Sequence, residues 1–362
     1  MRWSWQIGRI AGIRVQVHWT FLIIIAWVIL VHVADGATLL AAAVGVALVL
    51  AVFACVVLHE LGHALTARRF GITTRDITLL PIGGVARLER MPDEPRQELL
   101  VAIAGPAVNV VIATLLAVGL GLAGQLRPME DVTRVGAGFL SQLLWINVFL
   151  VLFNMLPAFP MDGGRVLRSL LAFKLPYARA TRIAATAGRG MAVLFGLAGL
   201  LLPNPFLVFI AIFVYLGAGA EAQVVEMRVA LDGLTVRDAM MTRFTALRDS
   251  ATLGDAAEEL LAGAQQDFPV VSDGRLLGVL SRGALVKHLR EHGRDPRVGN
   301  FVEGTCQTAV EHEPLERALQ RMRAARCVTM PVVRAGIVVG LVTMENVSEL
   351  LLVQGVGSGA VR

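Results

Sequence analysis

Five residues near one end of an apolar segment have types and spacing suited to metal-dependent hydrolysis. The sequence HELGH occupies residues 59–63. On a helix, His59 and His63 lie one turn apart on the same face, so both imidazoles can bind one zinc ion. Glu60 is then placed to take a proton from a zinc-bound water. The alternative is a helix end whose polar residues are satisfied by ordinary hydrogen bonds.

Two histidines leave such a site one protein ligand short, because catalytic zinc usually has three protein ligands and a water. A second polar interruption of an apolar run, NMLPAFPMDGG at 154–164, contains Asp162. It ends its run on the same predicted side of the membrane as His59 and His63. Asp162 is therefore at the right depth to be the third ligand, with a turn or N-cap role as the alternative.

The elements that must position these residues are membrane helices. The chain has 362 residues, of which 56% are hydrophobic and 17% charged, which excludes an ordinary soluble domain and a disordered chain. A bilayer core takes about 20 apolar residues as a helix. Six segments meet or approach this length, at 17–33, 38–66, 98–123, 136–157, 183–202 and 205–221. An ionisable group in such a helix costs about 2.5–3.5 kcal/mol, which metal coordination would offset.

Basic residues predict the orientation. If the N-terminus is inside, the inner segments carry nearly all the arginines and the outer loops carry only Arg127 and Arg134. This asymmetry predicts a multi-pass protein of the cell membrane with both termini cytoplasmic. The net charge of +5 is then explained by basic residues that flank the membrane spans. The lipid bilayer is the expected partner, and no nucleic acid is expected. Cys55, Cys306 and Cys327 give no disulfide framework, which fits a reducing compartment.

Three motifs together resemble the site-2 proteases, the zinc-dependent intramembrane metalloproteases of peptidase family M50. They are HELGH at 59–63, GPAVN at 105–109 and NMLPAFPMDGG at 154–164, and GRIAGIRVQVH at 8–18 and LPIGGVA at 80–86 are also similar to segments of that family. The resemblance covers about residues 5–220. It implies that His59, His63 and Asp162 bind one Zn²⁺ per chain and that Glu60 is the catalytic base.

The resemblance also indicates where a substrate would bind. It implies that Asn154 hydrogen-bonds the substrate backbone, with a helix-breaking role as the alternative. Residues 70–97 are expected to form short strands, in which Gly83 and Gly84 would let another backbone come close. A substrate helix has to unwind before it is cut, and pairing with an exposed strand edge would replace its lost hydrogen bonds.

Other residues near these motifs are assigned packing roles. Asn109, with Gly105 and Pro106, is expected to let two helices pack closely. Cys55 lies one turn before His59, and we expect a small buried thiol there because Asp162 completes the ligand set. Met161 stands where the family usually has Leu before the ligand Asp.

The region after the last span repeats itself at an offset of 62 residues, from Phe268 to Met330. FPVV at 268–271 matches MPVV at 330–333, and LGVLS at 277–281 matches VGLVT at 339–343. The pattern of strands and flanking helices resembles a pair of CBS domains. We place a transmembrane zinc metalloprotease domain at 1–221, a linker at 222–233, CBS domain 1 at 234–292 and CBS domain 2 at 298–353.

The CBS resemblance raises the question of an adenine nucleotide. Members that bind one use the Ser or Thr after the G-h-h motif and an Asp three residues later. The second repeat has Thr343 and Asn346, whereas the first has Ser281 and Ala284 and lacks the ribose partner. A nucleotide sensor and a module without a ligand, which regulates the protein or forms a homodimer, are equally compatible with these residues.

The sequence therefore predicts a polytopic α-helical membrane protein with about six transmembrane helices and short β segments near the active site, followed by an α/β CBS-pair cytoplasmic domain. Its predicted function is that of an intramembrane zinc endopeptidase (EC 3.4.24) that cleaves membrane-embedded protein substrates and is regulated by the CBS pair. The alternative is a CBS-regulated membrane channel or transporter. That function would need ionisable groups along a path across the bilayer, whereas here they gather at one end.

Overall fold

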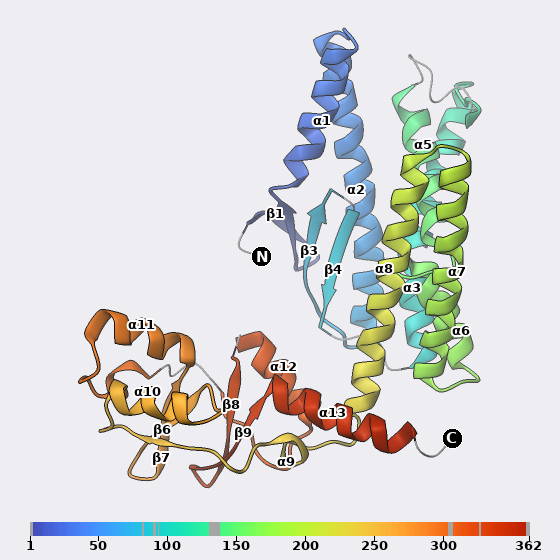
Figure 1. Ribbon diagram of the computed structural model, residues 1–362. Coiled ribbons are helices and arrows are strands. Elements are labelled where there is room, and N and C mark those ends of the chain that lie inside the picture. Colours follow the sequence, from blue (N-terminus) through green and yellow to red (C-terminus); the bar gives the residue numbers. More distant parts are fainter. Residues whose placement is uncertain are drawn as a thin grey trace. The chain divides into compact units, whose positions relative to one another are not determined.

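The computed structural model describes residues 3–359 except 82, 90, 91, 93, 130–137, 303–306 and 326. The chain divides into two compact units, Met1–Val225 and Glu226–Arg362. The first unit is a set of long helices with one small sheet, and the second contains both repeats (Figure 1).

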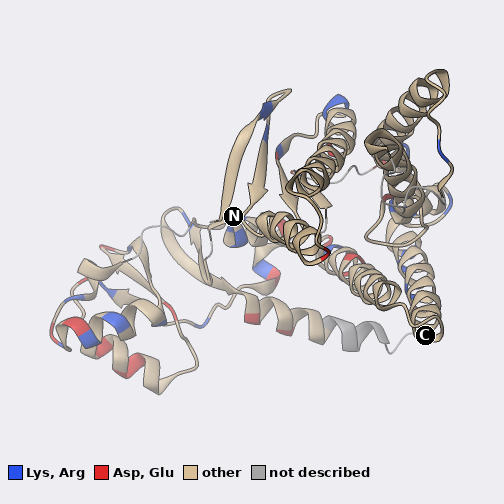
Figure 2. Ribbon diagram, turned by 90° about the horizontal axis from the view of Figure 1, so that it is seen from above, with Lys and Arg blue, Asp and Glu red and all other residues tan. Residues whose placement is uncertain are grey.

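Apolar helices dominate the first unit and confirm a polytopic membrane protein. Among the described residues, four helices are long and apolar enough to cross a membrane: α2 (Leu39–Arg69), α3 (Pro95–Leu122), α7 (Tyr177–Leu201) and α8 (Pro205–Leu231). The other two predicted spans correspond to shorter apolar helices, α1 (Phe21–Ala34) and α5 (Phe139–Asn154). Most of the length of these helices carries no charged residue (Figure 2).

Close helix packing in the first unit depends on small residues. A Cβ on Gly62 of α2 would lie 2.7 Å from the backbone oxygen of Ala104 on α3, so only glycine lets these two helices approach so closely. A short helix, α6 (Asp162–Ala172), follows α5 and packs against α3 and α7. The helices that carry HELGH and Asp162 are thus both held against α3.

A four-stranded sheet confirms the expected short strands near the site. Its strands are β1 (Ser4–Ile10), β2 (Ile13–His18), β3 (Thr74–Leu80) and β4 (Gly83–Leu88), in the order β1-β2-β3-β4. The β2 and β3 strands are parallel and the other pairs antiparallel. Apolar side chains of β2 and β3 pack on α1 and α2, which fixes the sheet beside the helix that carries HELGH.

The second unit is the CBS pair. Its first repeat contains β5 (Leu247–Arg248), α10 (Leu253–Ala262), β6 (Phe268–Ser272), β7 (Arg275–Leu280) and α11 (Arg282–His292). Its second contains α12 (Leu315–Ala325), β8 (Thr329–Arg334), β9 (Ile337–Thr343) and α13 (Met344–Gly359), and α9 (Val236–Ala239) and the short 3-10 helix η1 (Val298–Phe301) lie outside these elements.

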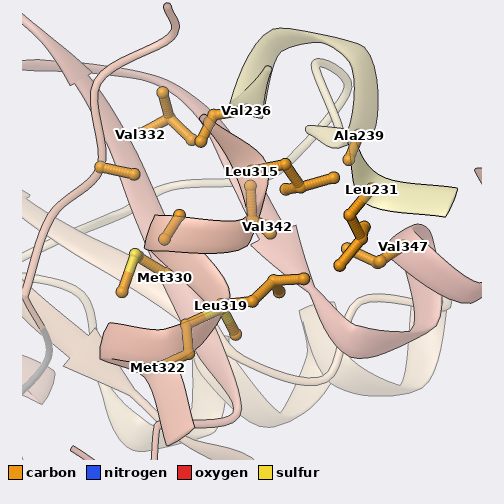
Figure 3. Close-up of a cluster of buried hydrophobic side chains, with 12 residues drawn as sticks. Leu231, Val236, Ala239, Leu315, Leu319, Met322, Met330, Val332, Val342 and Val347 are labelled. Carbon is orange, nitrogen blue, oxygen red and sulfur yellow. The ribbon is translucent and has the colours of Figure 1, made fainter. Parts of the chain in front are cut away.

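Each repeat has its own apolar core. In the core of the second repeat, Leu315, Leu319 and Met322 of α12 point toward Met330 and Val342 of the strands (Figure 3). The segment before the first repeat also belongs to this core through Leu231, Val236 and Ala239, also drawn in Figure 3. The N-terminal part of the unit therefore completes the repeat that is more distant in sequence.

The two repeats meet at equivalent positions. Asp267 precedes β6, and Thr329, which lies 62 residues later, begins β8. The Thr329 hydroxyl donates to the Asp267 carboxylate at 2.5 Å, and the other Asp267 oxygen accepts from the backbone amide of Arg282 at 2.9 Å.

Two details of the sequence interpretation change. Residues 222–231, within the predicted linker, are helical and continue α8 without a break. Cys327 is disulfide-bonded in the structure, so the expectation that the cysteines fit a reducing compartment is wrong for that residue, while Cys55 is free and buried. Cys306 lies outside the described residues.

Candidate active site

Three buried side chains from two helices bring their ligand atoms to one point. His59 Nε2 lies 3.1 Å from His63 Nε2, and each of these nitrogens lies 3.1 Å from Asp162 Oδ2. His59 and His63 are one turn apart near the end of α2, and Asp162 is the first residue of α6. The structure therefore brings together all three residues that the sequence indicated as metal ligands, although they are about 100 residues apart.

Hydrogen bonds at the far side of each imidazole fix its tautomer. The Nδ1 of His63 donates to the backbone carbonyl of Val101 at 2.6 Å, which can only accept. The Nδ1 of His59 donates to Asn109 Oδ1 at 2.5 Å. The amide nitrogen of Asn109 donates to Asn147 Oδ1 at 2.7 Å, which fixes the orientation of that amide.

This arrangement fits a zinc ion. With both protons on Nδ1, the two Nε2 atoms and the Asp162 carboxylate are three lone-pair donors only 3.1 Å apart. Such a cluster is unfavourable without a cation between its members. In a tetrahedral site with bonds of about 2.0–2.1 Å, neighbouring ligand atoms lie about 3.3–3.4 Å apart, so the observed spacing suits zinc with its fourth position open.

Glycines leave the space in which these ligand atoms meet. A Cβ on Gly105 of α3 would lie 2.2 Å from His63 Nε2 and 2.7 Å from His59 Nε2, so α3 passes the site with its backbone. A Cβ on Gly163 would lie 2.3 Å from the backbone oxygen of Leu156. Gly163 thus lets the turn before α6 fold tightly and place Asp162.

Glu60 lies beside these ligands at the wall of a cavity. The cavity has a volume of about 660 Å³, and Glu60 and Asp162 both line it. Among the described residues, no group donates a hydrogen bond to the Glu60 carboxylate. The carboxylate is therefore open to a water molecule in the cavity.

The strand β4 forms one wall of the same cavity. Gly83 and Gly84 line it, and a Cβ on Gly84 would lie 2.8 Å from the Cγ of Glu60. In the described part of the chain β4 pairs only with β3, so its other edge is unpaired. Asn154 also lines the cavity, and its side-chain amide donates to the backbone oxygen of Leu150 at 3.0 Å.

Most of the remaining lining is apolar, although Arg165 of α6 also lines the cavity. The apolar residues that α5 and α8 contribute are Phe149, Leu150, Phe153, Phe206, Phe209, Ile210 and Phe213. A cavity of this size with mostly apolar walls and a few polar groups is typical of a ligand-binding site.

The sequence interpretation missed a series of hydrogen-bonded polar side chains that begins at His59 Nδ1. Asn109 was assigned to helix packing, but it accepts the imidazole proton of His59. Behind it, Asn147 donates to the backbone oxygen of Leu143 at 2.8 Å and to Cys55 Sγ at 3.5 Å. The sequence did contain a signal for these roles, because a side-chain amide inside an apolar span needs a hydrogen-bond partner.

A second group of metal-binding side chains, His288, Glu291 and His292, lies on α11. The Glu291 and His292 side chains are each 48% exposed, and Glu291 forms ion pairs of 3.5 and 3.8 Å with the two imidazoles. Only part of this group is exposed, because His288 Nδ1 is buried and has no hydrogen-bond partner among the described residues. The group therefore differs from the site of the first unit, where all three side chains are buried and the ligand atoms lie 3.1 Å apart.

The predicted nucleotide residues form a helix cap. The Thr343 hydroxyl donates to Asn346 Oδ1 at 2.7 Å and accepts from the Asn346 backbone amide at 3.2 Å. In the first repeat, Ser281 accepts from the amide of Ala284 at 3.2 Å. Equivalent positions of both repeats therefore begin α13 and α11 in the same way.

Comparisons with known proteins show the family of the chain. The family model described as "Peptidase family M50" matches residues 47–138 and 130–195, and the CBS domain model matches 236–291 and 302–353. Zinc metalloprotease MJ0392 of Methanocaldococcus jannaschii is 30% identical over 96% of this chain and 96% of its own length. The chain belongs to peptidase family M50, the site-2 proteases.

Two solved structures resemble parts of this site-2 protease. The site-2 protease from Methanocaldococcus jannaschii is 36% identical and covers 61% of this chain and 95% of its own, with a TM-score of 0.46. CBSX2 in complex with AMP is 26% identical and covers 33% of this chain and 97% of its own, with a TM-score of 0.30. The family models and the relative of 30% identity make the chain a multi-pass membrane zinc metalloprotease with a CBS pair, which disfavours the channel or transporter alternative.

Proposed function

We propose that this site-2 protease is an intramembrane endopeptidase that hydrolyses peptide bonds of membrane-embedded protein substrates. The observation that carries the proposal is the convergence of three buried ligand atoms beside Glu60, in a cavity bounded by apolar helices and by the unpaired edge of β4. The apolar walls would accommodate an apolar segment of a substrate that leaves the bilayer. The polar groups at one end of the cavity would carry out its hydrolysis.

His59, His63 and Asp162 would hold the zinc ion. When bound, zinc supplies a Lewis acid that polarises the scissile carbonyl and lowers the pKa of a coordinated water. Glu60 accepts the proton from the attacking water and returns it to the nitrogen of the leaving amine. Asn109 and the Val101 carbonyl keep the protons of both imidazoles on Nδ1, so that Nε2 remains free to bind the metal.

The strand β4 would hold the substrate in an extended form. A peptide bond in a helix is shielded by its own hydrogen bonds and has to unwind before attack. Pairing with the unpaired edge of β4 at Gly83 and Gly84 would replace those bonds. Asn154 lines the same cavity and would hydrogen-bond the substrate backbone.

The substitution Glu60→Gln tests this function. It removes the base without removing a metal ligand, so cleavage of a co-expressed membrane substrate should be lost while zinc content stays at one per chain. Glu89→Gln, an exposed carboxylate just beyond β4, is the matched control and should cleave normally. Glu60→Gln protein that still cleaves, or that loses its zinc, would contradict the role given to Glu60.

The orientation is a second part of the proposal, and it rests on the distribution of arginines. We infer that the protein lies in the cell membrane with both termini in the cytoplasm. Cysteine placed at Gln125, in the exposed loop after α3, should react with an impermeant reagent in intact cells, and cysteine at Lys174 should not. The reverse pattern would place the CBS pair outside.

The CBS pair is proposed to regulate cleavage, either by binding an adenine nucleotide near Thr343 and Asn346 or by forming a homodimer. All three metal-site residues lie in the first unit. Removal of residues 234–362 should therefore preserve zinc binding but change the cleavage of a natural substrate. Unchanged cleavage would exclude regulation by this unit.

A further inference from the structure

A buried arginine on α6, Arg168, has no part in the chemistry described above. Its side chain is 0% exposed. It lies six residues after Asp162, on the helix that begins with that residue. A guanidinium that is buried without partners is strongly unfavourable, so the partners of Arg168 determine where α6 can lie.

These partners come from α3, α7, α8 and the turn before α6. The Nε of Arg168 donates to Glu98 Oε1 on α3 at 2.8 Å, and Nη2 donates to the same oxygen. Nη1 donates to Glu221 Oε1 on α8 at 2.6 Å. The guanidinium carbon also lies 4.9 Å from the ring centre of Phe159 and 5.0 Å from that of Tyr177. Arg168 therefore joins α6 to α3, to α7, to α8 and to the turn that precedes Asp162.

The contact with α3 bears directly on the metal site. Glu98 is one turn before Val101, whose carbonyl accepts the proton of His63, and two turns before Gly105, whose backbone passes both imidazoles. One helix thus orients the histidines and, through Arg168, holds the helix of the carboxylate ligand.

We propose that Arg168 is a positioning residue that holds Asp162 in register with His59 and His63. It thereby sets the zinc affinity of the site and the rate of cleavage. The part of this inference that concerns cleavage rests on the proposed function, whereas the part that concerns zinc affinity does not. Glu221 is the more exposed partner, with a side chain 27% exposed, and its loss is expected to have the smaller effect.

A purely structural role would give a different result. Buried ion pairs can often be replaced by apolar residues of similar size with little loss of stability. Glu98 Oε2 is buried without a hydrogen-bond partner among the described residues, so the ion pair leaves one polar atom unsatisfied. If Arg168 served stability alone, an apolar replacement of the pair would restore every property of the protein.

The test uses the full chain in detergent with Arg168→Lys and with the double variant Arg168→Met, Glu98→Met. Lys keeps the charge but lacks the planar fork that bonds Glu98 and Glu221 together. Zinc affinity is measured by competition with a chelator, kcat and KM with a membrane substrate, and stability by thermal unfolding. Ser169→Ala is the control, because it removes only a buried hydrogen bond within α6.

Both variants should bind zinc about 10–100-fold more weakly, as for other residues that support metal ligands. The kcat should fall with little change in KM, the double variant should unfold near the wild-type temperature, and Ser169→Ala should bind zinc normally. Wild-type zinc affinity in folded Arg168→Lys or in the double variant would overturn the proposal. If the double variant fails to fold, the zinc affinity of Arg168→Lys still tests the proposal. Wild-type protein that binds zinc but does not cleave would refute the proposed function and leave the zinc comparison valid.

Discussion

The two units of this protein both carry polar residues at positions that the sequence marks as functional, but the residues are used differently. In the first unit, His59, His63 and Asp162 point their lone pairs at a common centre. In the second, Thr343 and Asn346 hydrogen-bond to each other and begin a helix. A ligand is needed to complete the first arrangement, whereas the second is complete without one.

The difference shows which kind of geometry predicts a bound group. Polar atoms that already have hydrogen-bond partners in the chain do not indicate a bound ligand. The helix caps at Ser281 and Thr343 are examples. Buried lone pairs that face one another do indicate one, because they require a cation. This contrast can be tested by substitutions on both sides.

The largest effect is expected from Asp162→Ala. Two imidazoles alone hold zinc poorly, so zinc should fall well below one per chain and cleavage should be lost. The measurement is metal content of the purified chain together with a cleavage assay. Asp35→Ala, an exposed aspartate after α1, serves as the control. Full zinc in Asp162→Ala would show that another residue is the third ligand, with Cys55 the first to examine.

A smaller loss is expected from Asn109→Ala, which leaves the His59 imidazole without its acceptor. Residues that support a metal ligand in this way contribute about 10–100-fold in metal affinity or activity. Asn109→Asp retains an oxygen that can accept from His59 Nδ1 and should recover part of the loss. Thr114→Ala, which removes an exposed bond within α3, should change nothing. Equal behaviour of all three variants would refute the role given to Asn109.

Gly84→Ala, at the cavity wall, tests how closely the rate depends on the position of the Glu60 carboxylate. The new Cβ would lie 2.8 Å from the Cγ of Glu60 and 3.0 Å from Val56 Cγ1, so the carboxylate has to move. Displacement of a reacting group by about 1 Å costs up to about 100-fold in rate, while zinc should be retained because no ligand is touched. Gly8→Ala, with open space around it in β1, is the control. Unchanged kcat in Gly84→Ala would mean that Glu60 tolerates the shift.

The smallest effects are expected in the CBS pair. Thr343→Ala and Ser281→Ala each remove an N-cap, so each should lower stability by about 0.5–2 kcal/mol. Calorimetry of the full chain with AMP should detect at most one site, and only Thr343→Ala should weaken it. Two equal sites, or equal loss in both variants, would contradict the assignment of a site to the second repeat. No binding at all would favour the homodimer.

Much of this architecture could be predicted from the sequence. Long apolar runs locate the membrane helices because length and hydropathy alone decide whether a helix can span a bilayer. HELGH by itself contains two of the three proposed ligands, since a helix puts residues four apart on one face. The 62-residue repeat revealed the CBS pair for a similar reason, because the matching strands recur at one spacing.

The rest depends on contacts between distant segments. The roles of Asn109 and Asn147 arise only when α2, α3 and α5 are packed together. The same is true of Arg168. In the sequence it is one basic residue among many, and its partners are evident only when α3 and α8 pack around it. The continuation of α8 through residues 222–231 was missed because its polar second half lacks the signal of a membrane span.

The most direct test of the central claim, that His59, His63 and Asp162 form a catalytic zinc centre, is X-ray absorption at the zinc edge on the purified chain. The account predicts one zinc per chain, with two imidazole nitrogens and oxygen ligands at about 2.0–2.2 Å. The spectrum of Glu60→Gln should be essentially the same, since Glu60 is not a ligand. A sulfur ligand at about 2.3 Å, a spectrum with no imidazole, or a chain that binds no zinc would contradict it.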